Sequence, residues 1–535
     1  MKKTILIINL FAFFLSLNSI GQTKSKDVDI LWGPELKASK KSTLSDIVGY
    51  DETGIYAIKT KRKGLYGLNS TVNLEHYDKE MSQSKSVEIE LEEQKKERNF
   101  EFIIHIDNEM YIFSSFANQK LKKNFLFVQG VNKKTLQPNK DLRKIAEIDY
   151  SGKSKYNSGN FDYEISKDSS KVLIYYNLPY DKGESEKFGF HVFDKALNQL
   201  WEKNITLPYK EELFDVEDYE VDNKGNIHLL GLIFKEKRKE KRKGDPNYKY
   251  QVLSYLNNGN ELKEYPIKIE GKFLTDMQIA INDEQDIICG GFYSSEGTFS
   301  IEGSYFLKIN GETKEIKSKE FQNFGIDFIT QNMTERQEKK TKNKAAKGKD
   351  IELYQYDLDN IVLRDDGGAL LIGEQYFVRV VTRTDTDANG NTSTTTTYYY
   401  HYNDIIVINM SPDGKIDWSK KIAKKQVTRN DGGFFSSYAL SIVKDKLYFV
   451  FNDNPKNLFY KGEGKLYNFN KSKESLVVLV TLDNEGNQTR EALFSAKEAD
   501  ILTRPIVCEQ ISKNEMILFG QRKKTHRFAR ILFKE

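Results

Sequence analysis

Residues 221–232 read VDNKGNIHLLGL: a polar turn, Asp222 to Asn226, leads directly into an apolar, strand-like segment that includes Gly231. Asp, Asn and Gly are frequent in such turns because they tolerate left-handed backbone angles or hydrogen-bond their own backbone. The apolar segment is therefore expected to pair with the strand before the turn. The stretch predicts a β-hairpin, and the next question is whether the chain repeats it.

The same half-unit occurs eight times along the chain. The copies are DETGIYAIKT (51–60), DNEMYIFSSF (107–116), DSSKVLIYYN (168–177), DNKGNIHLLG (222–231), NDEQDIICGG (282–291), DDGGALLIGE (365–374), KDKLYFVFND (444–453) and KNEMILFGQR (513–522). A second half-unit of strand, polar turn and strand follows, for example IVINMSPDGKIDWSKKI (406–422). Two hairpins make a unit of four antiparallel strands, and most units lie about 55 to 60 residues apart.

The last unit is one strand short. Residues 504–535 supply three strands, whereas the strand-like segment DVDILWGPELKAS (27–39) stands before the first unit. Trp201 and Trp418 begin fourth strands, and Trp32 fits the same position. The N-terminal strand, 28–37, is therefore predicted to complete the last unit and close the ring, which would remove exposed sheet edges.

The period and the turn chemistry resemble the β-propeller superfamily over residues 23–535, although no WD, kelch or Asp-box signature is intact. The predicted fold is all-β: a single propeller of about eight four-stranded blades, or seven if one unit pairs differently. The blades start near 45, 99, 160, 214, 272, 354, 434 and 503. The resemblance implies a disc with a central channel and a binding face, and no particular activity. Tandem β-sandwiches are the alternative, but they explain neither the even period nor the missing strand.

The N-terminus, MKKTILIINLFAFFLSLNSIGQ, has two lysines, an apolar run from Ile5 to Leu17 and small or polar residues up to Gln22. This pattern predicts a signal peptide over residues 1–22 and a chain exported to the periplasm or beyond the cell. An uncleaved anchor is the alternative, but the run is shorter than the roughly 20 residues that span a bilayer. No later segment is long and apolar enough to span, and we expect a monomer.

Topology assigns the connections to two faces. Turns between the first and second strands of a blade, and between the third and fourth, lie on one face and are short; the remaining connections are long and mostly basic. Insertions on one face of a repeat fold indicate an interaction side. The predicted binding residues are Lys61, Arg62, Lys63, Lys237, Arg238, Lys241, Arg242, Lys243, Phe459, Tyr460, Arg522, Lys523 and Lys524.

Charge supports this prediction. The formal net charge is only +4, yet Lys235 to Lys243 holds seven basic and two acidic residues. A concentrated basic rim attracts anionic partners, which for an exported protein means acidic polysaccharide or an acidic envelope protein rather than nucleic acid. The alternatives are a solvated loop and a short helix with Glu–Lys pairs. The aromatic residues near Phe459 either form a ligand platform or pack the loop on its own blade.

One loop is a calcium candidate. DTDANGNTS (385–393) places oxygen donors at Asp385, Asp387 and Asn389, which resembles the first part of an EF-hand-type loop. The twelfth position is Thr396 rather than a bidentate Glu, and the flanks are rich in β-forming residues. A plain hairpin tip is therefore the alternative. No other cofactor is expected.

The sequence contains no recognised catalytic motif. The histidines are single and scattered, and no nucleophile elbow, Walker loop or dinucleotide fingerprint occurs. Cys289 and Cys508 lie in strand-like runs and are expected to be small buried side chains. We expect a non-catalytic propeller that binds an anionic polymer or protein through its basic loops. The alternative is a propeller hydrolase or lyase acting on glycans or peptides at the channel mouth.

Overall fold

The computed structural model describes residues 25–534, except 38–41, 64–68, 94–95, 151–157, 180–182, 237, 239–240, 243–244, 268, 270, 298–299, 350 and 445. The predicted signal peptide, 1–22, lies outside the described residues. Strands dominate the rest. The helices are α1 (Ile326–Thr330), α2 (Glu335–Ala345) and α3 (Ala496–Ala499), with short 3₁₀ turns η1 (Glu211–Leu213), η2 (Pro455–Asn457) and η3 (Pro505–Val507). None of the helices in this part of the chain is long and apolar enough to cross a membrane.

Eight antiparallel sheets of four or more strands follow one another in the described chain, and each is named after its first strand. The first four contain β3 (Ser42–Asp51), β4 (Gly54–Lys63), β5 (Asn69–Asp78) and β6 (Gln83–Glu88); β9 (Asn99–Ile106), β10 (Glu109–Asn118), β11 (Lys123–Asn132), β12 (Gln137–Pro138) and β13 (Arg143–Asp149); β14 (Asn160–Ile165), β15 (Lys171–Asn177), β16 (Ser185–Asp194) and β17 (Gln199–Lys210); and β18 (Phe214–Val221), β19 (Ile227–Phe234), β22 (Tyr248–Leu256) and β23 (Glu261–Ile267).

The other four contain β24 (Phe273–Ile281), β25 (Ile287–Ser294), β27 (Gly303–Ile309) and β28 (Ile316–Asn323); β30 (Tyr356–Leu363), β31 (Ala369–Thr386), β32 (Thr392–Met410), β33 (Ile416–Ile422) and β34 (Gln426–Arg429); β35 (Ala439–Val443), β36 (Lys446–Asp453), β37 (Leu476–Leu482) and β38 (Gln488–Ser495); and β39 (Leu502–Thr503), β40 (Glu509–Ser512), β41 (Glu515–Arg522), β42 (Thr525–Phe533), β1 (Val28–Trp32) and β2 (Leu36–Lys37). Short two-stranded pairs are β7 (Glu92–Glu93) with β8 (Lys96–Glu97), β20 (Lys241–Arg242) with β21 (Asp245–Pro246), and β26 (Ser300–Ile301) with β29 (Leu353–Tyr354). The last large sheet takes its name from β40.

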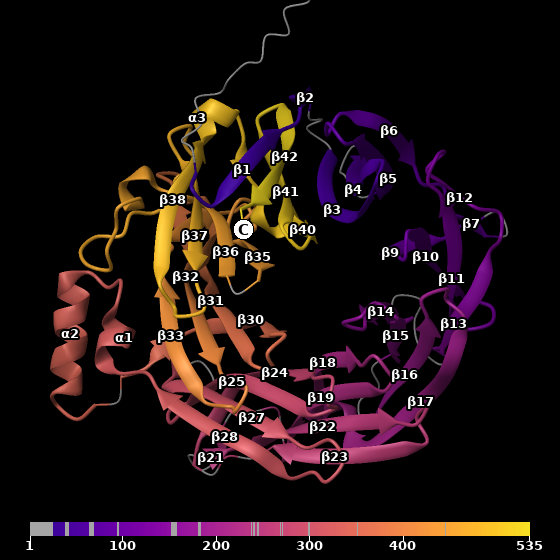
Figure 1. The fold of residues 1–535 in the computed structure, drawn as a ribbon, viewed down its shortest axis with the longest axis horizontal. Coiled ribbons are helices and arrows are strands. Elements are labelled where there is room, and N and C mark those ends of the chain that lie inside the picture. Colours follow the sequence, from indigo (N-terminus) through magenta and orange to yellow (C-terminus); the bar gives the residue numbers. More distant parts are fainter. Residues whose placement is uncertain are drawn as a thin grey trace, which may run out of the picture.

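The sheets stand around a common axis (Figure 1). Their first strands β3, β9, β14, β18, β24, β30, β35 and β40 lie innermost, and several of them contact each other directly, such as β18 with β24 and β24 with β30. Radially arranged antiparallel sheets define a β-propeller. The all-β fold and the resemblance to the β-propeller superfamily are therefore confirmed.

Apolar clusters fill the spaces between neighbouring sheets. One cluster joins the β14 and β18 sheets and includes Phe190, Trp201 and Tyr219. Another joins the β40 sheet to the β3 sheet, through Phe528 and Tyr77. Each fully buried large side chain contributes roughly 1.5–3 kcal/mol through the hydrophobic effect. The core is therefore distributed among the interfaces between sheets, and no single centre dominates it.

The sheet at the chain ends combines strands from both termini. β1 pairs antiparallel with β42, from Val28 opposite Phe533 to Trp32 opposite Ala529. Trp32 packs edge-on against Phe494 of the β35 sheet, and the Arg527 guanidinium lies over its ring. The other two tryptophans join sheets by a hydrogen bond, because the indole N–H of Trp201 donates to the Gly225 carbonyl at 2.9 Å and that of Trp418 to the Asn484 carbonyl at 2.9 Å.

The turn of the opening stretch holds itself together. The Asp222 carboxylate accepts hydrogen bonds from the backbone N–H groups of Lys224 and Asn226 and from the Asn226 side-chain amide. Gly225 has a positive φ of 84°, which favours glycine. The same arrangement of an Asp carboxylate with an Asn four residues later recurs at 194–198, 387–391 and 483–487. These turns stop one strand and start the next.

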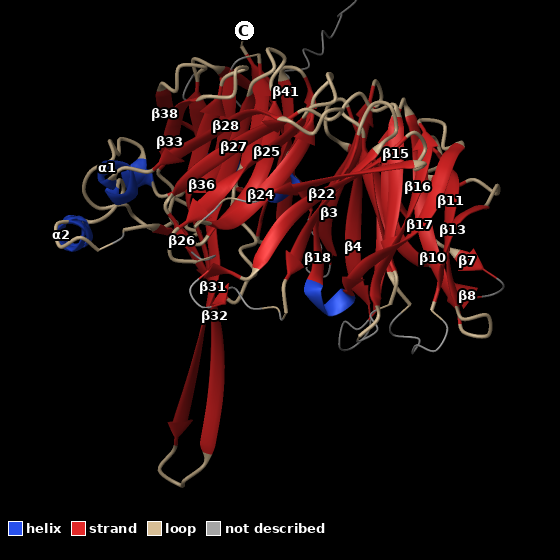
Figure 2. Cartoon of the chain, turned by 90° about the horizontal axis from the view of Figure 1, so that it is seen from below, coloured by secondary structure: helices blue, strands red, loops and turns tan. Residues whose placement is uncertain are grey.

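The two faces of the disc differ. In the side view, the short turns lie along one face and the longer connections between second and third strands along the other (Figure 2). The longest of these connections is the β31–β32 hairpin, which projects well beyond the disc.

Candidate functional site

The inner strands carry acidic side chains without basic ones. Of the thirteen carboxylates on these strands, Asp51 and Asp215 pair with Lys133 and Arg238. The other eleven, called the inner carboxylates, are Asp46, Glu101, Asp162, Glu164, Glu217, Asp218, Glu220, Asp276, Asp357, Asp359 and Glu509. Of the eight inner strands, all fully described, only β35 lacks a carboxylate, and none contains Lys or Arg. Glu164, Glu217, Asp359 and Glu509 are exposed although they belong to innermost strands. Solvent therefore reaches the inner edges of the sheets.

A β-bulge recurs at these carboxylates. The pairing register skips Glu101 in β9, Glu217 in β18 and Asp359 in β30. In β3 and β24 the carboxylates of Asp46 and Asp276 come directly after the skipped residue. A bulge bends the strand and redirects a side chain, and bulges are frequent next to active sites. The repeated bulge therefore places acidic groups at corresponding positions of five sheets.

Glycines in the second strands lie beside three of these bulges. Gly231 pairs with Val216, and a Cβ at Gly231 would lie 2.5 Å from the Phe214 ring. A Cβ at Gly291 would lie 2.1 Å from the Asp276 carbonyl oxygen, which no real Cβ tolerates. Gly373 pairs with Leu358 at the third bulge. The glycine of the opening stretch thus provides the space in which the inner strand bulges.

The environment of the inner carboxylates favours their protonated form. Desolvation by burial raises the pKa of Glu164 to about 7, with further contributions from the negative charges of Asp218 and Asp162. Desolvation likewise raises the pKa of Glu220 to about 8, assisted by Asp218 and Glu164, and that of Glu509 to about 7, assisted by Asp46. Repulsion by like charges therefore adds to desolvation at these three carboxylates, and no Lys or Arg of the described residues is among the causes of their shifts.

Two inner carboxylates also connect neighbouring sheets. Desolvation raises the pKa of Asp276 to about 7, although its carboxylate accepts a hydrogen bond from the Leu358 backbone N–H at 2.7 Å. Desolvation raises the pKa of Asp359 to about 7, and the Tyr438 hydroxyl donates to its carboxylate at 2.7 Å. These two side chains therefore link neighbouring sheets, and they also add negative charge near the common axis when they are ionised.

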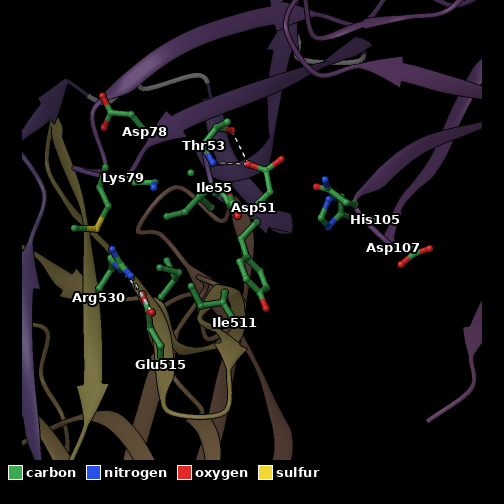
Figure 3. A pocket seen from close by; sticks show the side chains of 16 residues that line it. Asp51, Thr53, Ile55, Asp78, Lys79, His105, Asp107, Ile511, Glu515 and Arg530 are labelled. Carbon is green, nitrogen blue, oxygen red and sulfur yellow. Dashed lines mark hydrogen bonds and ion pairs between the residues drawn. The ribbon is translucent and has the colours of Figure 1, made fainter. Parts of the chain in front are cut away.

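A pocket of about 910 Å³ lies on the face of the short turns, where the β40, β3 and β9 sheets meet (Figure 3). Asp51, His105 and Asp107 line it together with the ion pair between Arg530 and Glu515. Desolvation raises the pKa of Asp51, but hydrogen bonds from Lys133 and Thr53 prevail and hold it well below its usual range. Asp51, Asp107 and Glu515 of this pocket each form an ion pair, in contrast to the inner carboxylates.

The predicted basic residues lie on connections between second and third strands or at the ends of the strands that lead into them, and their surroundings are unequal. Lys61, Lys523 and Lys524 are exposed. The Arg238 guanidinium donates hydrogen bonds to the backbone carbonyls of Glu211, Glu212 and Phe214 and pairs with Asp215 at 2.6 Å. These contacts lie within its own sheet, so they occupy its donors. Lys237 and Lys243 lie outside the described residues, whereas Arg62, Lys63, Lys241 and Arg242 belong to β4 and β20 without described side chains.

The other predicted binding residues also differ in their surroundings: one is exposed to solvent, one is buried and one forms an ion pair. Phe459 is 85% exposed. The Tyr460 hydroxyl is buried, and desolvation raises the pKa of Tyr460 to about 12. Arg522 pairs with Asp500 at 3.0 Å. Anion binding by these connections stays a prediction.

The calcium candidate forms the tip of the β31–β32 hairpin. The Asp387 carboxylate accepts from the backbone N–H groups of Asn389 and Asn391 and from the Asn391 amide, as in the three other Asp–Asn turns. Asp385 pairs with Arg383 at 3.0 Å. Calcium binding stays a prediction. Within the described part of the chain, no three His, Cys, Asp or Glu side chains are close enough to hold a metal ion.

Comparisons with known proteins add little beyond the fold. No family model matches the chain, and no curated protein sequence matches it. Among solved structures, the β-propeller domain of the Pyrococcus furiosus trilobed protease is 12% identical with a TM-score of 0.35, over 88% of this chain and 99% of that domain. Galerina marginata prolyl oligopeptidase B is 8% identical with a TM-score of 0.38, over 90% of this chain and 55% of that one. The polysaccharide lyase Uly1 is 8% identical with a TM-score of 0.35, over 94% and 100%.

Sequence reasoning identified the connections and missed the inner carboxylates. The missed signal is a short pattern that precedes the recurring turn: LSDI (44–47), VEDY (216–219), LTDM (274–277) and LDNI (358–361). In each, an acidic residue stands at or next to the bulge. Aligning the first strands of the units as well as the turns would have shown it.

Proposed function

We propose that the protein is an exported, non-catalytic β-propeller that binds a positively charged partner at its inner carboxylates. We also propose that the eight sheets are blades of one ring and that β1 completes the last blade. The β1–β42 pairing and the apolar cluster between the β40 and β3 sheets support closure. The partner differs in charge from the anionic one expected from the loops alone.

One observation carries the functional proposal: the eight inner strands hold thirteen carboxylates and no Lys or Arg. Two of the thirteen, Asp51 and Asp215, pair with basic residues of other segments. Clustered like charges destabilise the folded chain, and desolvation adds to that cost. A cationic ligand would offset the repulsion and the desolvation cost by attraction to the carboxylates, whereas an anionic ligand would add further repulsion. A protein segment or small molecule with several amines is the chemistry that fits.

The test is the binding of a labelled oligolysine peptide, measured by fluorescence anisotropy at low and high salt. The site variant combines Glu164→Gln, Glu220→Gln and Asp359→Asn. The control removes three carboxylates from the outer part of the β24 sheet, as Glu312→Gln, Glu315→Gln and Glu320→Gln. Loss of binding in the site variant and retention in the control support the proposal.

The pH dependence gives a second measurement with a definite sign. Because Glu164, Asp276 and Asp359 have a pKa of about 7, their negative charge increases between pH 6 and 8. Oligolysine should therefore bind more tightly at pH 8 than at pH 6. Equal binding by the site variant, or tighter binding at the lower pH, would count against the inner carboxylates.

The basic connections define a second binding hypothesis. Exposed Lys61, Lys523, Lys524 and Phe459 support it, because they lie on the same kind of connection. The ligand would be an acidic polysaccharide or an acidic envelope protein. The measurement is salt-sensitive capture from envelope extract, compared with a variant in which the seven Lys and Arg of 235–243 are changed to Ser.

An acid–base enzyme is the alternative function, and one cluster favours it. Glu220, with a pKa of about 8, is protonated at pH 7, whereas Asp218, with a pKa of about 6, is mostly ionised. Pairs of carboxylates in different protonation states supply the acid and base of glycan hydrolysis. A screen on glycans and peptides tests this, and Glu220→Gln should abolish any turnover found.

A further inference from the structure

The β31–β32 hairpin continues far beyond its sheet as a two-stranded ribbon, defined as Phe377–Thr386 and Thr392–His401 (Figure 2). Its register is continuous from Tyr376 opposite Tyr402 to Thr386 opposite Thr392. Residues 378–380 and 382–396 are exposed. An isolated two-stranded hairpin is marginally stable in water. The ribbon therefore lacks the packing that supports every other long strand of the disc.

The two faces of the ribbon differ in chemistry. One face is uncharged: Val380 pairs with Tyr398, and the hydroxyls of Thr382 and Thr396 lie 3.4 Å apart. The opposite face carries Arg379, Arg383 and Asp385. Arg383 is paired with Asp385 at 3.0 Å, whereas Arg379 makes no ion pair with any residue of the described chain.

The ribbon has one long open edge. β30 covers β31 only as far as Gln375, and the Tyr376 N–H donates to Gln355. Beyond Tyr376, no described strand pairs with this edge. On the other side, β34 and Asn430 cover β32 from His401 and its neighbours up to Tyr398. The open edge, 377–386, contains no Pro, Lys or bulge. Its only protection against pairing is the charge of Arg379, Arg383 and Asp385, because charged side chains discourage unspecific edge pairing.

Charges along the open edge select one way of pairing it with an identical edge. In an antiparallel, twofold symmetric pair, each residue lies opposite the one equally far from the centre. A centre at Val381 places Arg379 opposite Arg383, and a centre at Arg383 places that residue opposite itself, so both oppose like charges. A centre at Val380 leaves every charge opposite an uncharged residue. A centre at Thr384 opposes Arg383 and Asp385, which already pair within one chain. A centre at Thr382 instead places Arg379 of each copy opposite Asp385 of the other.

We propose that the open edge of β31 binds the same edge of a second copy of this chain, antiparallel, with Thr382 on the twofold axis. The two ribbons then form one four-stranded sheet from Val378 to Thr386. Arg379 gains the partner that its own chain does not supply. At about 3.4 Å per residue, this register leaves the two discs separated by roughly the length of the ribbon.

The first test is sedimentation velocity of the full chain over a concentration series from about 1 µM to 1 mM. We expect a reversible monomer–dimer equilibrium. Arg379→Asp places like charges opposite each other twice, so the dimer should weaken about tenfold. The double variant Arg379→Asp with Asp385→Arg restores opposite charges in this register and should recover the dimer. Arg383→Ser is the control, because in this register Arg383 lies opposite Val381.

Cysteine cross-linking tests the register independently of affinity. Thr382→Cys places two thiols directly opposite each other, so oxidation should give a covalent dimer on a non-reducing gel. Thr384→Cys lies opposite Val380 and should give little. The natural thiols give a low background, because burial raises the pKa of Cys289 and of Cys508 to about 12.

Three results would overturn the proposal. One is a monomer throughout the concentration range, which would leave the edge for a strand of another protein. Another is a dimer that Arg379→Asp does not weaken or that the charge swap does not recover. The third is equal cross-linking at 382 and 384. None of these results bears on the inner carboxylates, since oligolysine binding is measured on the same variants and should be unchanged.

Discussion

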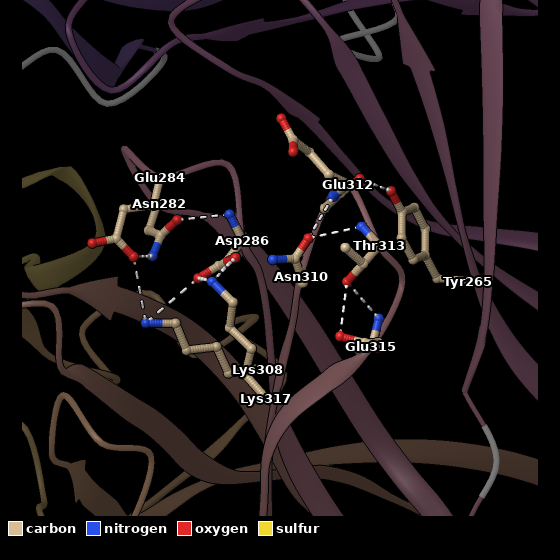
Figure 4. Close-up of polar contacts among 11 residues, drawn as sticks. Tyr265, Asn282, Glu284, Asp286, Lys308, Asn310, Glu312, Thr313, Glu315 and Lys317 are labelled. Atoms are coloured by element: carbon tan, nitrogen blue, oxygen red, sulfur yellow. Dashed lines mark hydrogen bonds and ion pairs between the residues drawn. The ribbon is translucent and has the colours of Figure 1, made fainter.

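The innermost and the outermost strands of the sheets carry charge in opposite ways. Outer strands such as β13, β23 and β28 mix Lys or Arg with Asp or Glu, and their charges pair. Figure 4 shows such a group on the β24 sheet: the buried carboxylate of Asp286 binds Lys317 at 2.7 Å and lies 3.6 Å from Lys308. The inner strands have only the acidic half of this pattern.

This difference separates two roles for charge. Paired charges on the outer strands keep the surface soluble, and each exposed pair contributes little to the free energy of unfolding. Unpaired carboxylates at the inner edge lower stability, and strongly shifted pKa values concentrate at functional sites. The comparison therefore indicates that the carboxylates near the common axis of the sheets lower stability and are kept because they bind a partner.

The largest expected effect comes from a buried carboxylate that does have a partner. Lys424 is fully buried and paired with Glu374. Lys424→Met would leave the Glu374 charge buried and unpaired, and we expect a loss of about 3–5 kcal/mol in the free energy of unfolding. Urea unfolding at pH 7.5 measures it. The double variant Lys424→Met with Glu374→Met should recover most of the loss. A loss below about 1 kcal/mol would mean that pairing matters little even inside the sheet.

A smaller effect is expected where a glycine accommodates an inner bulge. Gly291→Ala brings a Cβ within 2.1 Å of the Asp276 carbonyl, so the backbone must move. We expect a loss of about 2–3 kcal/mol, together with a change in oligolysine binding as the Asp276 carboxylate moves. Gly325→Ala is the matched control, because a Cβ there meets nothing within 4 Å. Equal stability of the two variants would show that the bulge is not held by the glycine.

The smallest effect is a pH dependence with an unusual sign. Inner carboxylates bind protons more tightly in the folded chain, where Glu220 has a pKa of about 8 and Glu509 about 7, than in the unfolded chain. Stability therefore falls as the pH rises from about 5 to 8. We expect a higher melting temperature at pH 6 than at pH 8, and added salt should stabilise the chain at pH 8 by screening the repulsion.

The matched variants distinguish inner from outer carboxylates. Glu220→Gln with Glu509→Gln should reduce the difference between pH 6 and pH 8. Glu147→Gln should not, because hydrogen bonds from Lys123 and Lys144 lower the pKa of Glu147, so that it stays ionised across this range. A melting temperature that rises from pH 6 to pH 8 in the unchanged protein would contradict the shifted pKa values.

The sequence predicted the parts of this fold that local chemistry controls. Turns such as Asp222–Asn226 and the alternation of apolar residues after them determine hairpins, and eight of them predict a propeller. The inner carboxylates could not be placed in the same way, because their proximity depends on how separate sheets meet at the axis. The negative charge of Asp46 contributes to the raised pKa of Glu509 although the two residues lie far apart in the sequence.

Other features depended on side-chain contacts that spacing does not reveal. Arg238 looked like a free basic residue, but it binds backbone carbonyls of its own sheet. The flanks of DTDANGNTS correctly suggested a long hairpin, yet its projection beyond the disc follows from the absence of a neighbouring strand past Gln375. The basic stretches of the sequence therefore indicated the long connections. They did not indicate which of their side chains are free to bind a partner.

The pairing of β1 with β42 has a kinetic consequence. The Lys534 ammonium donates a hydrogen bond to the Ser25 carbonyl across a separation of 509 residues, so the ribosome makes the two paired strands far apart in time. Closing such a long loop is slow compared with forming a local hairpin. Until β42 emerges from the ribosome, β1 has no strand to join, and afterwards the edge of β42 can accept β1 from another nascent chain as readily as its own. Exchange of this strand between molecules is therefore the characteristic misfolding route of this architecture.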